Sequence, residues 1–150
     1  MLSSQQNRLV KAIALHLGEI AVNRAIPGTD SLLCPDIVVT DEDWKKIILV
    51  DVTIPFENRT TAFRQARARK LEKYAPLPDT LRAKGYEVHT DALIVGTLGA
   101  WDPLNERVLR TCGVDRRYAR LMRCLMVSDA IRWSRDIYTE HVTGHRQYQE

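Results

Sequence analysis

The sequence predicts one α/β domain, with strands in the middle and helices on the outside. Three observations support this class. Residues 47–55 form a β-branched run that ends at a proline, residues 88–95 form a second run whose end at 91–95 is almost wholly apolar, and helical spacing of apolar residues precedes or follows each run. A chain of 150 residues is long enough to bury a core without further support. We therefore expect a single domain over residues 1–150.

The N-terminal part predicts a helix followed by a hairpin. Leu9, Ile13, Leu17 and Ile20 recur at helical spacing, which predicts an amphipathic helix over residues 5–23. A turn is expected at residues 27–30, a strand at residues 32–39, and a polar turn at residues 40–43. The strand over residues 47–54 would then pair with the first strand as a hairpin.

The central strand carries one acidic residue. Alternation places Val50, Val52 and Ile54 on one face and Asp51 on the other. A buried carboxylate costs several kcal/mol unless it is paired, solvated or bound to a cation. Asp51 is thus either a solvated side chain facing a groove or part of a functional site.

A helix is expected from Thr60 or Thr61 to about residue 74, ended by prolines at positions 76 and 78. Its inward stripe is predicted to consist of Phe63, Ala66, Arg67, Lys70 and Tyr74. Lys70 falls at the centre of this stripe, which requires either snorkelling or a nearby anion. Lys73 falls at its flank, about 60° away.

The C-terminal part predicts a buried strand and two helices. The strand at residues 88–95 is expected to be covered on both faces. One helix should follow Asp102 and reach residue 110, and Asp115 should cap a longer one. The apolar stripe of the longer helix is predicted from five residues: Tyr118, Leu121, Met122, Leu125 and Met126. The tail after about residue 139 is expected to be loosely held.

Composition excludes several classes of protein. No apolar run reaches the length of a membrane span, and charged residues interrupt the N-terminal apolar positions, so neither a membrane anchor nor a secretion signal is expected. Three scattered cysteines do not form a disulfide framework or a zinc motif. Seven acidic residues lie between positions 30 and 57, with eight basic residues at 59–84 and six arginines at 107–123. An acidic centre between basic flanks is typical of a metal-dependent enzyme acting on a polyanion.

Three side chains are predicted to converge. Asp36 and Asp51 would lie on neighbouring strands of the hairpin, and two adjacent carboxylates favour a cation between them. Oxygen ligands in a partly open site suit Mg²⁺ or Mn²⁺. Lys70 could approach from the helix and stabilise charge that develops on a phosphodiester. The site is therefore predicted from two acids and a lysine.

These residues resemble a known pattern. The runs Cys34-Pro35-Asp36, Val50-Asp51-Val52-Thr53 and Lys70-Leu71-Glu72-Lys73-Tyr74, with the apolar run at residues 94–101, are similar to the PD-(D/E)XK nuclease superfamily. The closer resemblance is to the restriction-like endonuclease domain of site-specific non-LTR retrotransposons. It covers about residues 7–142 and implies a mixed β-sheet flanked by helices in an αβββαβ order, with additional C-terminal helices.

The resemblance also implies roles for individual residues. Asp36 and Asp51 would bind the metal with the Val52 carbonyl, and Glu19 would correspond loosely to an acidic residue on the first helix of related resolvases. Thr53 stands where the superfamily has a lysine, and in the retroelement branch the following helix supplies that lysine. Lys70 would then be the active-site lysine, with Lys73 and Tyr74 assisting.

Two functions are compatible with these residues. One is a Mg²⁺-dependent DNA endonuclease that nicks a strand to prime reverse transcription, with a resolvase-like enzyme acting on branched DNA as a close variant. The other is a non-catalytic DNA-binding module. Related elements place a reverse transcriptase and a zinc knuckle before this domain, which predicts a fragment or solitary domain, a nuclear location, a reverse transcriptase partner and possible homodimers. Predicted DNA contacts are Arg64, Arg67, Arg69, Tyr74, Arg116, Arg117, Arg120 and Arg123.

Overall fold

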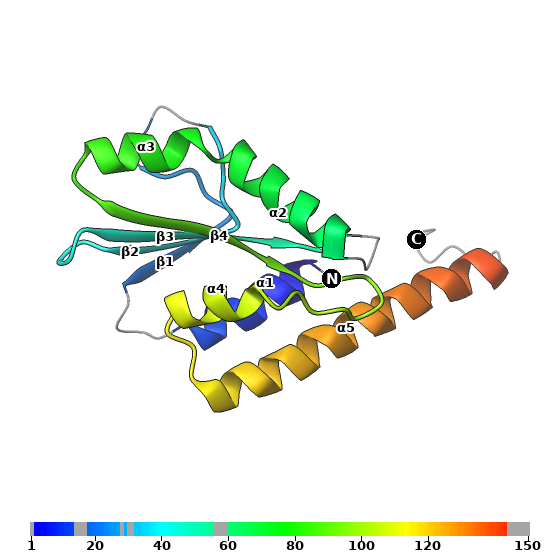
Figure 1. Cartoon of the computed structure of the whole chain (residues 1–150). Helices are drawn as coiled ribbons and strands as arrows, with labels where there is room; N and C mark the ends of the chain where they lie inside the picture. Colours follow the sequence, from blue (N-terminus) through cyan, green and yellow to red (C-terminus); the bar gives the residue numbers. More distant parts are fainter. Residues whose placement is uncertain (1, 14–17, 28, 30–31, 56–59, 144–150) are drawn as a thin grey trace.

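The protein is a three-layer α/β domain with a four-stranded sheet between two groups of helices (Figure 1). The computed structural model describes residues 2–13, 18–27, 29, 32–55 and 60–143. The sheet has the order β1-β2-β3-β4, and its strands span Glu19–Val22, Ile37–Asp41, Lys46–Thr53 and Glu87–Ile94. The first three strands are antiparallel, whereas β4 is parallel to β3. The predicted α/β class with a mixed sheet flanked by helices is confirmed.

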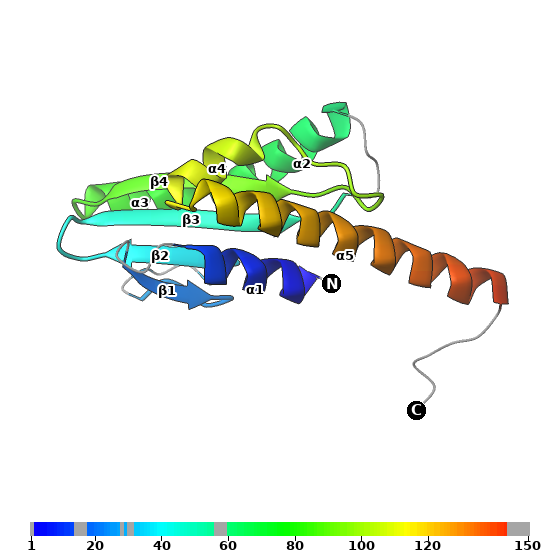
Figure 2. The ribbon, with the colours of Figure 1, turned by 90° about the horizontal axis from the view of Figure 1, so that it is seen from below.

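The strands β2 and β3 form the predicted hairpin, with Ile37 opposite Val50 and Asp41 opposite Lys46. A parallel strand cannot follow through a tight turn, so the chain crosses over before β4. The crossover consists of α2 (Thr60–Lys73) and α3 (Pro76–Ala83), which cover one face of the sheet. The other face is covered by α1 (Leu2–Ala12), α4 (Asn105–Thr111) and α5 (Arg116–Thr143). Figure 2 shows α5 running past the end of the sheet.

Both faces of β3 are buried. Ile48, Val50 and Val52 pack in the core shared with α1, α4 and α5. Ile47 and Leu49 pack in the core under α3 and the end of α2. The predicted alternation along β3 is therefore correct. The face that carries Asp51 borders a second core, and Asp51 is itself only 3% exposed, so the solvated alternative is wrong.

The predicted helix over residues 5–23 is wrong in its second half. The helix α1 ends at Ala12, and residues 19–22 form the edge strand β1 against β2. Gly18 explains the change, because its φ of +140° and its approach to the Thr40 carbonyl leave no room for a side chain. Residues 14–17, which include Leu17, lie outside the described residues, as do parts of the predicted turn at 27–30.

One helix was not predicted, and one strand boundary differs. The helix α2 ends at Lys73, as the prolines predict, but Pro76 then begins α3, where its missing N–H costs nothing. Leu77 and Leu81 of α3 are buried against the sheet. The strand β2 begins at Ile37, not at residue 32, because Pro35 cannot donate to a ladder.

The long helix α5 packs through only part of its predicted stripe. Met122, Met126 and Ala130 are buried, whereas Leu121 and Leu125 are exposed. The helix also continues to Thr143, through the first part of the tail that was expected to be loose; residues 144–150 lie outside the described residues. Among the described helices, none combines the length and apolarity that a membrane crossing requires.

A buried guanidinium ties α2 to the free edge of the sheet. Arg67 is 5% exposed and donates to Asp91 and to the Ala92 carbonyl of β4. It also donates to Asp102 at 3.0 Å and to Asn105 at 3.2 Å, before and within α4. The prediction that Arg67 contacts DNA is therefore wrong, because its donors are directed into the protein.

We expect Arg67→Ala to lower the free energy of unfolding by about 3 kcal/mol or more, since it leaves the buried Asp102 carboxylate without its cation. Arg64→Ala on the exposed side of the same helix is the matched control and should change it by less than ~0.5 kcal/mol. Urea unfolding monitored by circular dichroism measures both. Equal losses in the two variants would contradict a structural role for Arg67.

Candidate metal centre

Asp36 and Asp51 are held side by side by reciprocal backbone contacts. The Asp36 N–H donates to Asp51 Oδ1 at 2.9 Å, and the Val52 N–H donates to Asp36 Oδ2 at 2.8 Å. Asp36 immediately precedes β2 and Asp51 lies near the end of β3, so the hairpin register brings them together. The predicted convergence of the two acids is confirmed as geometry. The Asp51 carboxylate is thus held by the backbone of Asp36, and the Asp36 carboxylate by the backbone of the residue after Asp51.

Lys70 approaches the pair from α2. Its Nζ lies 3.1 Å from Asp51 Oδ2, and 30% of the lysine side chain is exposed. The helical stripe explains this placement, because Ala66 and Tyr74, one turn before and after Lys70, are buried on the same face. The Lys70 ammonium thus has a carboxylate partner, while part of the lysine side chain is exposed to solvent.

One carboxylate oxygen has an unusual environment. Asp51 Oδ2 is fully buried and accepts no hydrogen bond from any described residue. The Lys70 Nζ lies within ion-pair distance of this oxygen. Such an oxygen carries negative charge with lone pairs still available, which is the property of a cation ligand.

The backbone supplies a further oxygen at the same place. Residues of β3 alternate in direction, and the Val52 N–H points toward Asp36 rather than toward β4. The Val52 carbonyl leaves the strand on that same side, where Pro35 has no N–H to donate to it. No three His, Cys, Asp or Glu side chains converge among the described residues. Two carboxylates and a carbonyl fit Mg²⁺ or Mn²⁺ in donor type, with water completing the shell.

The charges of the site perturb its titration. Burial raises the pKa of Asp36 above its usual value, the neighbouring Asp51 raises it further, and the Val52 N–H and Lys70 oppose this rise. Tyr74 borders the site, and its hydroxyl donates to the Cys34 carbonyl at 3.3 Å. Burial, followed by the charges of Asp51 and Asp36, raises the pKa of Tyr74 to about 12. The phenol is therefore protonated at neutral pH and acts as a donor.

Two residues near Asp36 were not anticipated. Gln6 of α1 is 4% exposed, and its carboxamide contributes a hydrogen bond that lowers the pKa of Asp36. Asn23 pairs with Gln6 through its side chain at 3.2 Å and donates its backbone N–H to the Asp36 carbonyl at 3.0 Å. Gln6 precedes Asp36 by 30 positions, and no local pattern marks it. Its place follows from the way α1 packs under the sheet.

Other predicted residues are not brought to this centre. Glu19 lies on β1 opposite Thr40, four residues along the sheet from Asp36, which is about 13 Å. Lys73 is exposed and its Nζ lies 5.2 Å from the Tyr74 ring centroid. Tyr74 is 5% exposed, which leaves little surface for DNA contact. Arg64 and Arg69 are exposed on α2, and Arg116, Arg117, Arg120 and Arg123 are exposed on α5.

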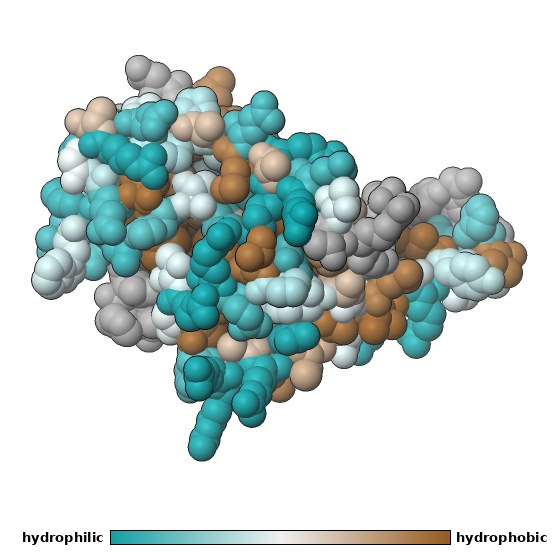
Figure 3. Space-filling view, viewed as in Figure 1, coloured by the Kyte–Doolittle hydropathy of each residue, from teal (hydrophilic) through white to brown (hydrophobic). Residues whose placement is uncertain are grey.

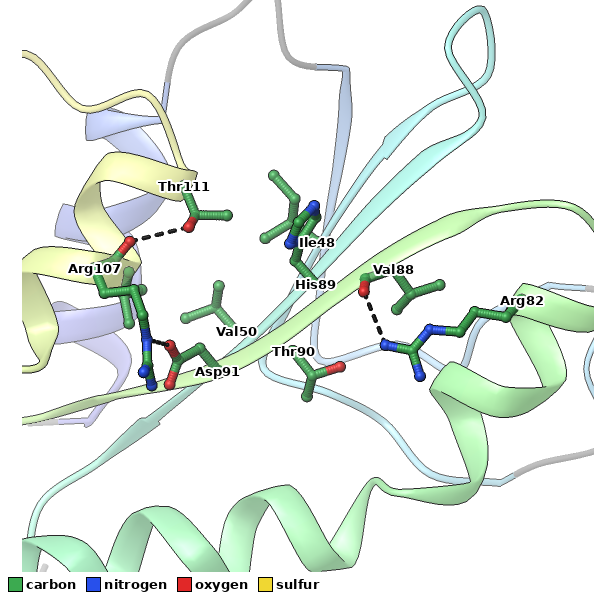
Figure 4. A pocket seen from close by; sticks show the side chains of 10 residues that line it. Ile48, Val50, Arg82, Val88, His89, Thr90, Asp91, Arg107 and Thr111 are labelled. Atoms are coloured by element: carbon green, nitrogen blue, oxygen red, sulfur yellow. Dashed lines mark hydrogen bonds and ion pairs between the residues drawn. The ribbon is translucent and has the colours of Figure 1, made fainter.

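A larger hollow lies elsewhere on the surface. It has a volume of about 400 Å³ and lies beside β4, over Ile48 and Val50 (Figure 4). Its charged groups are already engaged, because Arg107 donates to Asp91 and Arg82 donates to the Val88 carbonyl. It lacks an uncompensated carboxylate pair. The paired acids make the Asp36–Asp51 centre the better chemical site.

Comparison with known proteins adds little. No protein-family model matches the chain, and no curated protein is similar to it. A solved structure of an N-terminal domain of a reptarenavirus L protein is similar over 80% of this chain and 62% of that chain, with 17% identity and a TM-score of 0.41. The chain thus spans less than two thirds of the length of that neighbour. A likeness of this degree carries no argument about activity.

The folded state raises the pKa of Asp36. Its ionised carboxylate therefore opposes folding once the pH exceeds the pKa that this side chain has in the unfolded chain. We expect Asp36→Asn to be more stable than wild type near ~pH 7 in chelator, and the advantage to vanish as the pH falls through the pKa of Asp36 toward ~4. Urea unfolding across this pH window tests it. A variant less stable than wild type near neutrality would contradict the expectation.

Proposed function

We propose that this protein is a metal-dependent DNA endonuclease that nicks a strand by phosphodiester hydrolysis. The observation that supports this most is the buried Asp51 carboxylate: its Oδ2 forms an ion pair with Lys70 at 3.1 Å but no hydrogen bond with a described residue, and its Oδ1 accepts the Asp36 N–H. A purely structural aspartate at this depth would be expected to have its oxygens hydrogen-bonded. A cation-binding role for this carboxylate explains why its Oδ2 is buried without a hydrogen bond to a described residue.

Each residue has a distinct task in the proposed reaction. Asp36, Asp51 and the Val52 carbonyl would hold Mg²⁺ or Mn²⁺, which when bound polarises a phosphodiester and lowers the pKa of water. Lys70 stands beside the carboxylates and partly in solvent, where its ammonium can stabilise charge on the phosphate oxygens. Tyr74 keeps its proton and limits the movement of the Cys34–Asp36 segment through its hydrogen bond to the Cys34 carbonyl.

The polyanionic substrate is supported by charge. Arg64 and Arg69 are exposed on α2, the same helix that carries Lys70, and make no ion pair with described residues. Guanidiniums in this position can contact phosphates on either side of the scissile bond. In an intact retroelement, such a nick would supply the primer for reverse transcription.

We expect Asp36→Ala and Asp51→Ala to abolish nicking of supercoiled plasmid in Mg²⁺, while DNA binding stays equal or becomes tighter. Each variant removes a metal ligand together with a charge that repels phosphate. Arg132→Ala, on the exposed far part of α5, should nick like wild type. Undiminished nicking by Asp51→Ala, or by wild type in excess chelator, would refute the proposed site. Binding without nicking by the wild type would indicate a non-catalytic module instead.

The two lysines of α2 should behave differently. Lys70→Ala should reduce turnover on the order of 10²-fold or more, since it removes a charge next to the reacting phosphate. Lys73→Ala is its matched control, because Lys73 lies over the Tyr74 ring and outside the carboxylate pair. Single-turnover nicking rates distinguish them. An inactive Lys73→Ala beside an active Lys70→Ala would show that the lysine assignment is wrong.

A further inference from the structure

A second basic surface lies on the other side of the sheet. It is a groove of about 260 Å³ between α4 and the first part of α5, lined by Glu106, Arg116, Ala119, Arg120 and Arg123. Figure 3 shows hydrophilic side chains gathered over this part of the molecule, whereas hydrophobic side chains become more frequent over the far end of α5. The groove is therefore a local, strongly polar feature of α5.

The arginines of the groove are not neutralised by the fold. Arg116, Arg120 and Arg123 make no ion pair with any described residue, although all three lie on one face of α5. Other guanidiniums are compensated: Arg8 by Asp129, Arg67 by Asp91 and Asp102, and Arg107 by Asp91. Three like charges held within a single groove repel one another, and an anion would relieve this repulsion.

Trp101 contacts two of the residues that line the groove, Arg123 and Glu106. Its ring lies under the Arg123 guanidinium, 5.5 Å from centroid to Cζ, and its Nε1 donates to Glu106 at 3.2 Å. The indole thus holds Arg123 at a defined place, and its N–H engages one oxygen of Glu106, the only carboxylate among the described residues that line the groove. This leaves three guanidiniums to dominate the potential of the groove.

The spacing of the arginines suits a nucleic-acid backbone. The eight helical residues from position 116 to position 123 rise by about 10 Å along the axis of α5. The phosphates of a DNA strand recur at regular, closely spaced intervals, so a row of this length can contact more than one phosphate of the same strand. Small anions would occupy only part of this length.

The sheet separates this groove from the candidate metal centre. Asp51 and Lys70 lie on the α2 face, whereas α4 and α5 pack on the face that presents Val50 and Val52. We propose that the groove binds the backbone of a second DNA segment while the first segment occupies the Asp36–Asp51 centre. The choice of DNA as the ligand rests on the proposed function, whereas the presence of a separate phosphate-binding surface rests on the groove itself.

The test is the number of short duplexes, each of about 12 base pairs, that one full-length chain binds at saturation in chelator. Sedimentation velocity with a labelled duplex measures it, and chelator prevents cleavage. We expect two duplexes per wild-type chain and one per chain of Arg116→Glu/Arg120→Glu. The matched control, Arg132→Glu/Arg135→Glu, reverses two charges farther along α5 and should still bind two.

A reciprocal variant makes the test decisive. Arg64→Glu/Arg69→Glu on α2 should also reduce the number of bound duplexes to one. The remaining duplex should be lost when Arg116→Glu/Arg120→Glu is added to this variant. A wild-type stoichiometry of one, or no loss in the groove variant, would overturn the inference. A chain that nicks plasmid but binds one duplex would leave the proposed function intact, and a chain that binds two without nicking would refute only the proposed function.

Discussion

The structure is organised around a carboxylate that is buried at the end of a central strand. Asp51 sits where β3 is flanked on one side by β2 and on the other by β4, and almost none of its surface reaches solvent. A charge in such a place must be compensated, since its desolvation costs several kcal/mol. The Asp36 N–H and the Lys70 ammonium provide part of this compensation. Asp51 Oδ2 is ion-paired with Lys70 but accepts no hydrogen bond from a described residue, so it keeps lone pairs that a bound cation could use.

The same requirement shapes the helix that carries the lysine. Lys70 meets Asp51 only if α2 lies at a fixed height over the sheet. One turn earlier, Arg67 reaches past the free edge of β4 to Asp91 and Asp102. These buried ion pairs lock the rotation of α2, because a planar guanidinium with several partners tolerates little displacement. The ionic network of Arg67 therefore positions a site that it does not touch.

Much of this centre could be predicted from the sequence, and the reason is local. The short connection between β2 and β3 predicts a hairpin whose register sets Asp36 beside Asp51, and helical spacing places Lys70 on the inward stripe. Arg67 lay on that same stripe, but its acidic partners lie 24 and 35 positions later, so its role depends on tertiary structure. Gln6 was missed for the same reason.

The most direct test of the central claim is paramagnetic broadening of backbone amide signals by substoichiometric Mn²⁺ in the isotope-labelled full-length chain. Ions shared by Asp36, Asp51 and the Val52 carbonyl should broaden the amides of these residues first, and the effect should be absent in Asp51→Asn. The α5 amides, across the sheet, serve as the internal reference. Broadening that begins elsewhere, or that persists unchanged in Asp51→Asn, would contradict a metal centre at this place.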